Sequence, residues 1–100
     1  MTQDVTVATI GAHVGRSVVL KGWLYNKRSS GKIHFLQVRD GTGIIQCVME
    51  KSTVPQEMFL LADRTLQESS VVVEGTVRED PRSPIGYELG VTDFHVVSMS

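Results

Sequence analysis

A single segment with helical periodicity interrupts a chain that otherwise has the pattern of β-strands, and its position constrains the fold most. The segment covers residues 55–66, PQEMFLLADRTL. Four of its apolar residues share one helical face: Met58, Leu61, Ala62 and Leu66. Pro55 suits the first turn of a helix, where its missing N–H costs nothing. We therefore expect a helix whose apolar side chains, Met58 and Phe59 among them, pack against a sheet.

Segments rich in β-branched and aromatic residues surround this helix. They lie at residues 17–26, 32–39, 44–50, 70–78 and 87–97. Gly22 and Gly75 interrupt two of these segments, which indicates bulges or sharp bends. Turn-forming residues separate the segments at 29–31, 40–43 and 80–86, and a short helical turn is expected at 9–15.

The order β-β-β-α-β-β is that of the OB-fold, an all-β, five-stranded Greek-key barrel with a helix between strands three and four. A simple meander or an SH3-like barrel also has five strands, but the helix in this particular gap favours the OB-fold. The chain has 100 residues with no internal repeat and no linker, so we expect one domain over residues 1–100.

Composition narrows the classes of function. A net charge of −1 argues against a general nucleic-acid coat protein, although it allows a local basic patch. No apolar run approaches the roughly 18 residues that span a membrane, and the polar N-terminus does not resemble a secretory signal. A cytoplasmic protein is expected. Cys47, the single cysteine, cannot form an internal disulfide and is interpreted as a small core residue.

No catalytic constellation is visible in the sequence. His13, His34 and His95 have no partner cysteine or carboxylate at metal-ligand spacing, and we interpret them as surface or strand residues. The glycines at 41 and 43 are interpreted as part of a hairpin turn, because neither a helix nor Gly-Lys-Ser/Thr follows them. We expect no catalytic residue, no metal and no cofactor in this domain.

A binding surface is better supported. In an OB-fold, strands two and three and two loops form the ligand groove, and here these loops, NKRSSGK and DPRSPIG, both carry Arg or Lys with small flexible residues. Strand alternation directs Leu36 and Val38 inward. The same alternation directs Phe35, Gln37 and Arg39 outward, and Gln46 is expected beside Phe35 across the hairpin.

An outward ring, an amide and flanking cations suit a nucleic-acid base. Stacking on such a ring contributes about 1–3 kcal/mol per base, and an amide can bond to a base edge. Residue types alone leave other ligands open, because OB-folds also bind oligosaccharides and proteins. Phe35 packing on another domain and a register slip of one residue also stay open.

The ordered segments GWLYNKRSSGKIHFLQVRDGTGIIQCV, QESSVVVEGTVRED and GYELGVTDFHVVS closely resemble a known family. It is the N-terminal anticodon-binding domain of class IIb aminoacyl-tRNA synthetases, and the chain is most similar to the bacterial asparaginyl members. The resemblance extends from about Val18 to Ser98. Single pieces such as RDGTG are weak signals, whereas the whole ordered series is a strong one.

The resemblance implies a partner and a set of contacts. The partner is a tRNA anticodon stem-loop whose middle base is uridine. Phe35 is expected to stack on that uridine, and Arg28 and Gln46 to hydrogen-bond to it. Glu88 matches an acidic position near the first or middle anticodon base. Further cationic contacts to the RNA are expected from Lys32, Arg39, Arg78 and Arg82.

The family also contains a class II catalytic domain, which binds ATP, Mg and the amino acid and is absent from this sequence. We therefore expect this domain not to be an enzyme by itself. The parent enzyme is expected to be a homodimer that charges tRNA(Asn) with asparagine. Two alternatives stay open: a domain of the aspartyl type, and an OB-fold used as a protein-binding or structural scaffold.

Overall fold

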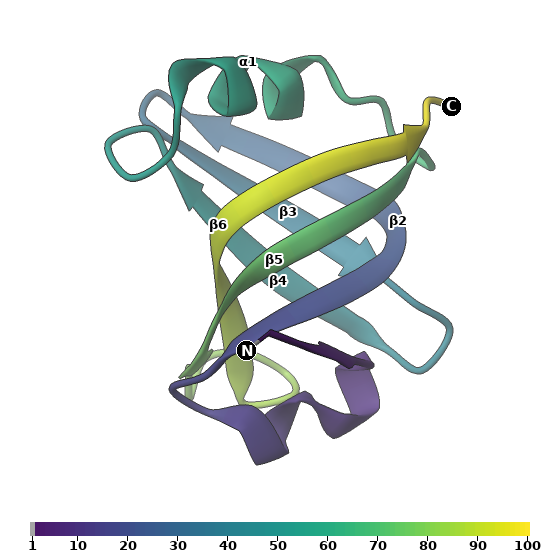
Figure 1. The fold of residues 1–100 in the computed structure, drawn as a ribbon, viewed down its shortest axis with the longest axis vertical. Helices are drawn as coiled ribbons and strands as arrows, with labels where there is room; N and C mark the ends of the chain where they lie inside the picture. Colours follow the sequence, from purple (N-terminus) through teal and green to yellow (C-terminus); the bar gives the residue numbers. More distant parts are fainter. Residues whose placement is uncertain (1) are drawn as a thin grey trace.

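The computed structural model describes residues 2–100, which form a closed β-barrel with a helix at each end (Figure 1). The strands are β1 (Gln3–Val5), β2 (Ser17–Ser30), β3 (Ile33–Arg39), β4 (Ile44–Glu50), β5 (Ser70–Glu79) and β6 (Tyr87–Ser98). A 3-10 helix, η1 (Val7–His13), and an α-helix, α1 (Gln56–Arg64), complete the chain.

The strands pair in the order β1-β2-β3-β4-β6-β5, and β2 pairs with β5 to close the ring. The parallel β4–β6 contact at Cys47 and Leu89 joins the two halves of the barrel, as the Greek-key connection requires. Strands β2 to β6 are the five strands that the sequence predicts, and α1 lies between the third and fourth of them. The OB-fold prediction is therefore confirmed.

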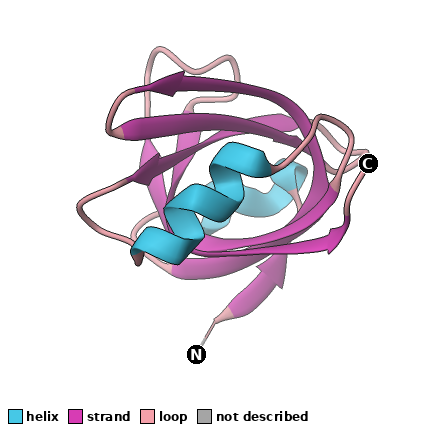
Figure 2. Cartoon of the chain, turned by 90° about the horizontal axis from the view of Figure 1, so that it is seen from above, coloured by secondary structure: helices cyan, strands magenta, loops and turns pink. Residues whose placement is uncertain are grey.

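The barrel interior is filled by the inward-facing residues of each strand. Leu20, Leu24, Leu36, Ile45, Leu89 and Phe94 are fully buried or nearly so. Helix α1 lies across one open end of the barrel (Figure 2) and contributes Phe59 and Ala62 to this core. Cys47 is also buried there, as predicted, and burial together with the charge of Glu88 raises the pKa of its thiol to about 12.

Three features differ from the sequence predictions. A sixth strand, β1, pairs in parallel with β2; its residues, QDV, are too polar and too few to show a strand period. Strand β2 continues to Ser30 because residues 26–30 pair with β3, so the predicted turn at 29–31 shrinks to the link around Gly31. Helix α1 ends at Arg64, which leaves Leu66 outside the helix and 55% exposed.

The two strand glycines allow close backbone approach, and at Gly75 the register of β5 against β6 also shifts. A side chain at Gly22 would collide with the carbonyl oxygen of Arg39, and one at Gly75 with that of Gly90. The register of β2 against β3 shifts between Leu24 and Asn26, so the bulge of β2 lies at Tyr25 and not at Gly22. Both glycines therefore let the bent strands come close together, as strand glycines do at barrel corners.

The RDGTG hairpin attaches η1 to the lower end of the barrel. The Asp40 carboxylate accepts hydrogen bonds from the Val7 N–H at 2.8 Å and from the Thr42 hydroxyl at 2.7 Å. Thr42 in turn accepts one from the Ala8 N–H. Burial alone would raise the pKa of Asp40, but these bonds together hold it below its ordinary value. This motif is thus a structural clamp next to the loop ends of β3 and β4.

Candidate nucleic-acid interface

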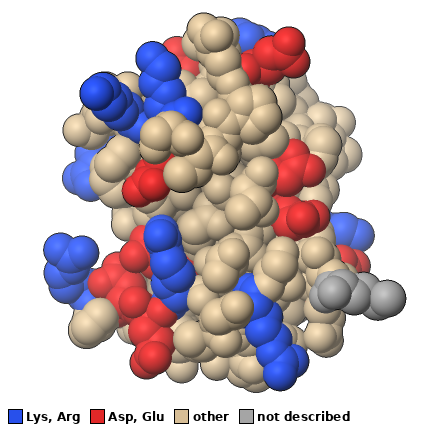
Figure 3. All heavy atoms as spheres, turned by 60° about the vertical axis from the view of Figure 1, so that its left-hand side comes forward, with Lys and Arg blue, Asp and Glu red and all other residues tan. Residues whose placement is uncertain are grey.

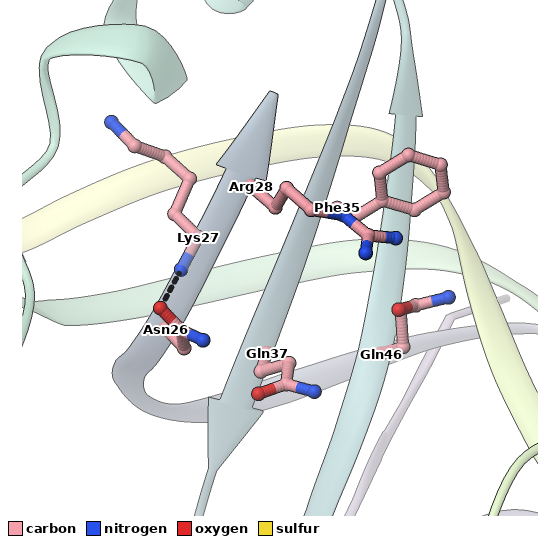
Figure 4. A pocket seen from close by; sticks show the side chains of 6 residues that line it. All are labelled: Asn26, Lys27, Arg28, Phe35, Gln37 and Gln46. Carbon is pink, nitrogen blue, oxygen red and sulfur yellow. Dashed lines mark hydrogen bonds between the residues drawn. The ribbon is translucent and has the colours of Figure 1, made fainter. Parts of the chain in front are cut away.

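The outward face of β2, β3 and β4 gathers the residues on which the binding hypothesis depends. Arg28 of β2 lies opposite Phe35 of β3, and Asn26 lies opposite Gln37. On the other side of β3, Gln37 lies opposite Gln46 of β4. Because opposite residues in antiparallel strands share a face, these five side chains form one surface. Figure 4 shows them projecting from the three strands into the same space.

Phe35 is partly exposed on this face, while its neighbours Leu36 and Val38 are fully buried. The alternation predicted for this strand is therefore confirmed. The guanidinium carbon of Arg28 lies 4.9 Å from the centroid of the Phe35 ring, within the range of a cation–π contact. The Phe35 ring is thus already in contact with a cation of the protein itself.

Gln46 lies beside Phe35 across the hairpin, as expected, although not directly opposite it. Val48 occupies the position opposite Phe35, and Gln46 faces Gln37. The hairpin loop of four residues at 40–43 sets this register, because Arg39 pairs with Ile44 directly. Gln46 is therefore a diagonal neighbour of Phe35, still within reach of a group lying on the ring.

A groove of about 830 Å³ runs over this surface. One side, the sheet wall, consists of Arg28, Phe35, Gln37, Ile44 and Gln46. The other side, the loop wall, is part of the β5–β6 loop and consists of Asp80, Arg82, Ser83, Pro84 and Ile85. Strands β2 to β4 and the β5–β6 loop, far apart in sequence, thus border one groove, as in the ligand site of an OB-fold.

The loop wall is held by short local hydrogen bonds. Asp80 is nearly buried; its main-chain N–H donates to Gly86, and its side chain accepts from the Arg82 N–H at 3.1 Å. The Arg82 side chain is 92% exposed and its Nε lies 3.6 Å from the Asp80 carboxylate. Arg82 therefore places a solvated charge at the rim of the groove.

Four predicted contacts lie outside this groove. The Arg78 guanidinium lies 3.3 Å from the Glu88 carboxylate and packs on Gly90, beside a separate, shallower hollow. Arg39 lies over the rings of Trp23 and Tyr25, at 5.1 and 5.8 Å from their centroids. Lys32 is exposed in the turn between β2 and β3. The sequence could not indicate that Arg78 and Glu88 pair, because the register of β5 against β6 decides it.

Two residues of the site carry little signal in the sequence. Asn26 enters the surface because the bulge at Tyr25 restores the outward phase of β2 after Leu24. Ile85 lines the loop wall, where its half-buried side chain adds apolar surface beside the cations. The period-two pattern of residues 26–30 could have indicated Asn26, had the strand been predicted to continue beyond it.

Charge on the molecule is mixed rather than uniformly basic. Figure 3 shows one face that carries both basic and acidic side chains around a broad uncharged area. The net charge is −1. The groove therefore presents an aromatic ring, amides and a few cations rather than a continuous basic surface. Within residues 2–100, no helix is long and apolar enough to cross a bilayer.

A closed five-stranded barrel with an outward aromatic ring, amides and cations in a groove between the sheet and the β5–β6 loop defines an OB-fold nucleic-acid-binding module. Residues 18–97 match the tRNA anticodon family, described as "OB-fold nucleic acid binding domain", and the chain belongs to that family.

Individual relatives narrow the resemblance. The asparagine–tRNA ligase of Pelotomaculum thermopropionicum is 51% identical over 98 residues, which are 98% of this chain and 23% of that protein. The same enzyme of Thermus thermophilus is 50% identical over 94 residues, 94% of this chain and 22% of that protein. The crystal structure of asparaginyl-tRNA synthetase from Pyrococcus horikoshii superposes with a TM-score of 0.89 at 39% identity, covering 96% of this chain and 23% of that one. The chain therefore spans less than a quarter of the length of each.

Proposed function

We propose that this chain binds the anticodon stem-loop of an asparagine-type tRNA and reads its middle uridine. The observation that carries the proposal is the sheet wall itself, where Phe35, Arg28 and Gln46 converge on one groove. A base entering the groove would stack on the Phe35 ring, and its edge would meet the amide of Gln46.

The donors and acceptors of these side chains fit uracil. Uracil presents an acceptor where cytosine presents the N4 amino donor. The Arg28 guanidinium only donates, so it complements uracil and opposes cytosine. Gln46 carries both a donor and an acceptor and can match either base by turning its amide. We therefore assign the discrimination between U and C to Arg28, with Gln46 adding affinity.

The five remaining candidates have different relations to the groove. Arg82 on the loop wall is exposed enough to contact a phosphate. Glu88 can accept from a base edge only beside its partner Arg78, because the two are paired at 3.3 Å. Lys32 directly precedes β3 and Arg39 ends it, so the two would contact RNA that extends beyond the groove.

The proposal extends to the parent enzyme. With about 50% identity to asparagine–tRNA ligases, this domain would serve a homodimeric cytoplasmic enzyme that charges tRNA(Asn) with asparagine, using ATP and Mg. Asparagine, ATP and Mg would not bind to residues 2–100, and the isolated domain would catalyse nothing. The same identities support the asparaginyl type over the aspartyl type.

The test is a titration of two stem-loops, identical except for U or C at the middle anticodon position, at one fixed salt concentration. Wild type should bind the U stem-loop more tightly, and Arg28→Met should reduce that preference, because it keeps the apolar stem but removes the donors. Lys21→Met is the matched control, since Lys21 pairs with Asp4 away from the groove. Equal affinity of wild type for both stem-loops would contradict the assignment.

Chemical-shift mapping in the same titration addresses the scaffold alternative. Shifts should concentrate on β2, β3, β4 and the loop wall. Shifts that instead concentrate on α1 would favour a protein-binding or structural role for this domain.

A further inference from the structure

Lys27 and Arg28 are neighbouring cations, but their side chains leave β2 on opposite sides. Arg28 lies over Phe35 on the open face, whereas Lys27 pairs in register with the buried Leu36. Lys27 borders the small hollow that Arg28 and Phe35 also line, but Figure 4 shows its side chain extending away from these two residues, toward the helix. The alternation of a strand explains the split, and it gives the two charges different surroundings.

The Lys27 ammonium group lies at the C-terminal end of α1. Its Nζ donates to the main-chain carbonyls of Ala62 and Thr65, each at 3.2 Å, and also to that of Asp63. The last carbonyls of a helix have no partner within the helix, and a cation there is favoured by the helix dipole. All three donors of Lys27 are therefore used by protein.

A second connection joins the same side of the hairpin to α1. The buried His34 of β3 stacks on Phe59 of α1, with ring centroids 3.9 Å apart. Its Nε2 lies 3.1 Å from the Phe59 carbonyl, which can only accept, so Nε2 is the donor. Nδ1 then accepts from the Ser29 hydroxyl at 2.7 Å. Ser29 follows Arg28 directly, and His34 precedes Phe35.

The far half of β2 needs such support. Ser17–Trp23 pairs with β5, and Leu24 bonds to the main chain of Glu68 and Ser69, but residues 26–30 pair with β3 alone. Arg28 thus belongs to a stretch with a strand on only one side. Helix α1 supplies the second support through Lys27 and through Ser29, His34 and Phe59.

We propose that Lys27 is a positioning residue, which anchors the hairpin to α1 so that Arg28 and Phe35 are presented to the RNA, while making no contact with RNA itself. Ser29 and His34 complete the anchor. This inference rests on the proposed function for its consequence in binding, although the anchor itself can be tested without RNA.

The binding test compares Lys27→Met, Lys27→Arg and the remote control Lys21→Met across a range of salt concentrations. Lys27→Met should lower affinity for the U stem-loop by about threefold to tenfold, as residues without ligand contact can. The preference for U over C should shrink, the salt slope should stay unchanged, and Lys27→Arg should restore most of the loss. A direct phosphate contact would instead lower the slope by about 0.7 with the preference kept, and that result would overturn the proposal.

Hydrogen exchange on the free protein separates this inference from the proposed function. Lys27→Met should accelerate exchange at residues 26–30 and in the last turn of α1, relative to β5 of the same molecule. Lys21→Met should not. If wild type binds neither stem-loop, the proposed function fails while this measurement still decides the anchor. Unchanged exchange in Lys27→Met would overturn the proposal that Lys27 anchors the hairpin to α1.

Discussion

The two walls of the groove differ in how they are held. Residues of the sheet wall are fixed by strand register, and Arg28 already rests on Phe35. The loop wall is held by hydrogen bonds among residues 80–86, such as Ser83 to Asp80 at 3.0 Å, and its Arg82 is largely solvated. A pre-organised wall can select a base by geometry, because it does not pay to be ordered on binding. The loop wall supplies charge without fixed geometry.

Removal of the ring from the sheet wall should have the largest effect. Phe35→Ala is expected to weaken binding of the U stem-loop by about 1–3 kcal/mol, the usual contribution of stacking on an aromatic ring. Tyr25→Ala is the control, because Tyr25 is another exposed aromatic residue but does not line the groove. Isothermal titration at fixed salt measures both. Equal losses in the two variants would mean that the groove is not the binding site.

Removal of one amide from the sheet wall should cost less. Gln46→Ala is expected to lose about 1 kcal/mol of binding free energy, the net contribution of one hydrogen bond. Gln37→Ala is its matched control, since Gln37 is the same residue type directly opposite. A larger loss for Gln37→Ala would assign the base contact to the central strand instead.

Removal of the charge from the loop wall should weaken binding without changing the choice of base. Arg82→Ala should reduce affinity for the U and C stem-loops by the same factor and lower the salt slope by about 0.7, the effect of one phosphate contact on a single strand. Titrations at several salt concentrations check this. A selective loss for one stem-loop would place Arg82 among the base-reading residues and remove the distinction between the walls.

Acid should weaken the clamp below the sheet wall through Asp40. The pKa of Asp40 is lowered in the folded state, so its contribution to stability is present above the unfolded value and is lost as the pH falls through the folded value, below about pH 4. Asp40→Asn should make unfolding less dependent on pH in this range. The fluorescence of Trp23, the single tryptophan, can follow unfolding.

Much of the fold was predictable because the relevant signals are local. Alternation placed Leu36 and Val38 inside and Phe35 outside, and the helical period located α1 to within two residues at each end. Cys47 was correctly placed in the core. The strand β1 and the continuation of β2 were missed, because both depend on a pairing partner rather than on their own residue pattern.

The sequence by itself determined which residues could form a base-binding surface, since residue type and strand phase decide what points outward. Only the tertiary structure decided how they are grouped. Register set Gln46 opposite Gln37, paired Arg78 with Glu88, and committed Lys27 to the end of α1 while leaving Arg28 on Phe35. These outcomes depend on contacts between residues far apart in the chain, and no local pattern specifies which partner a charge or an amide will meet.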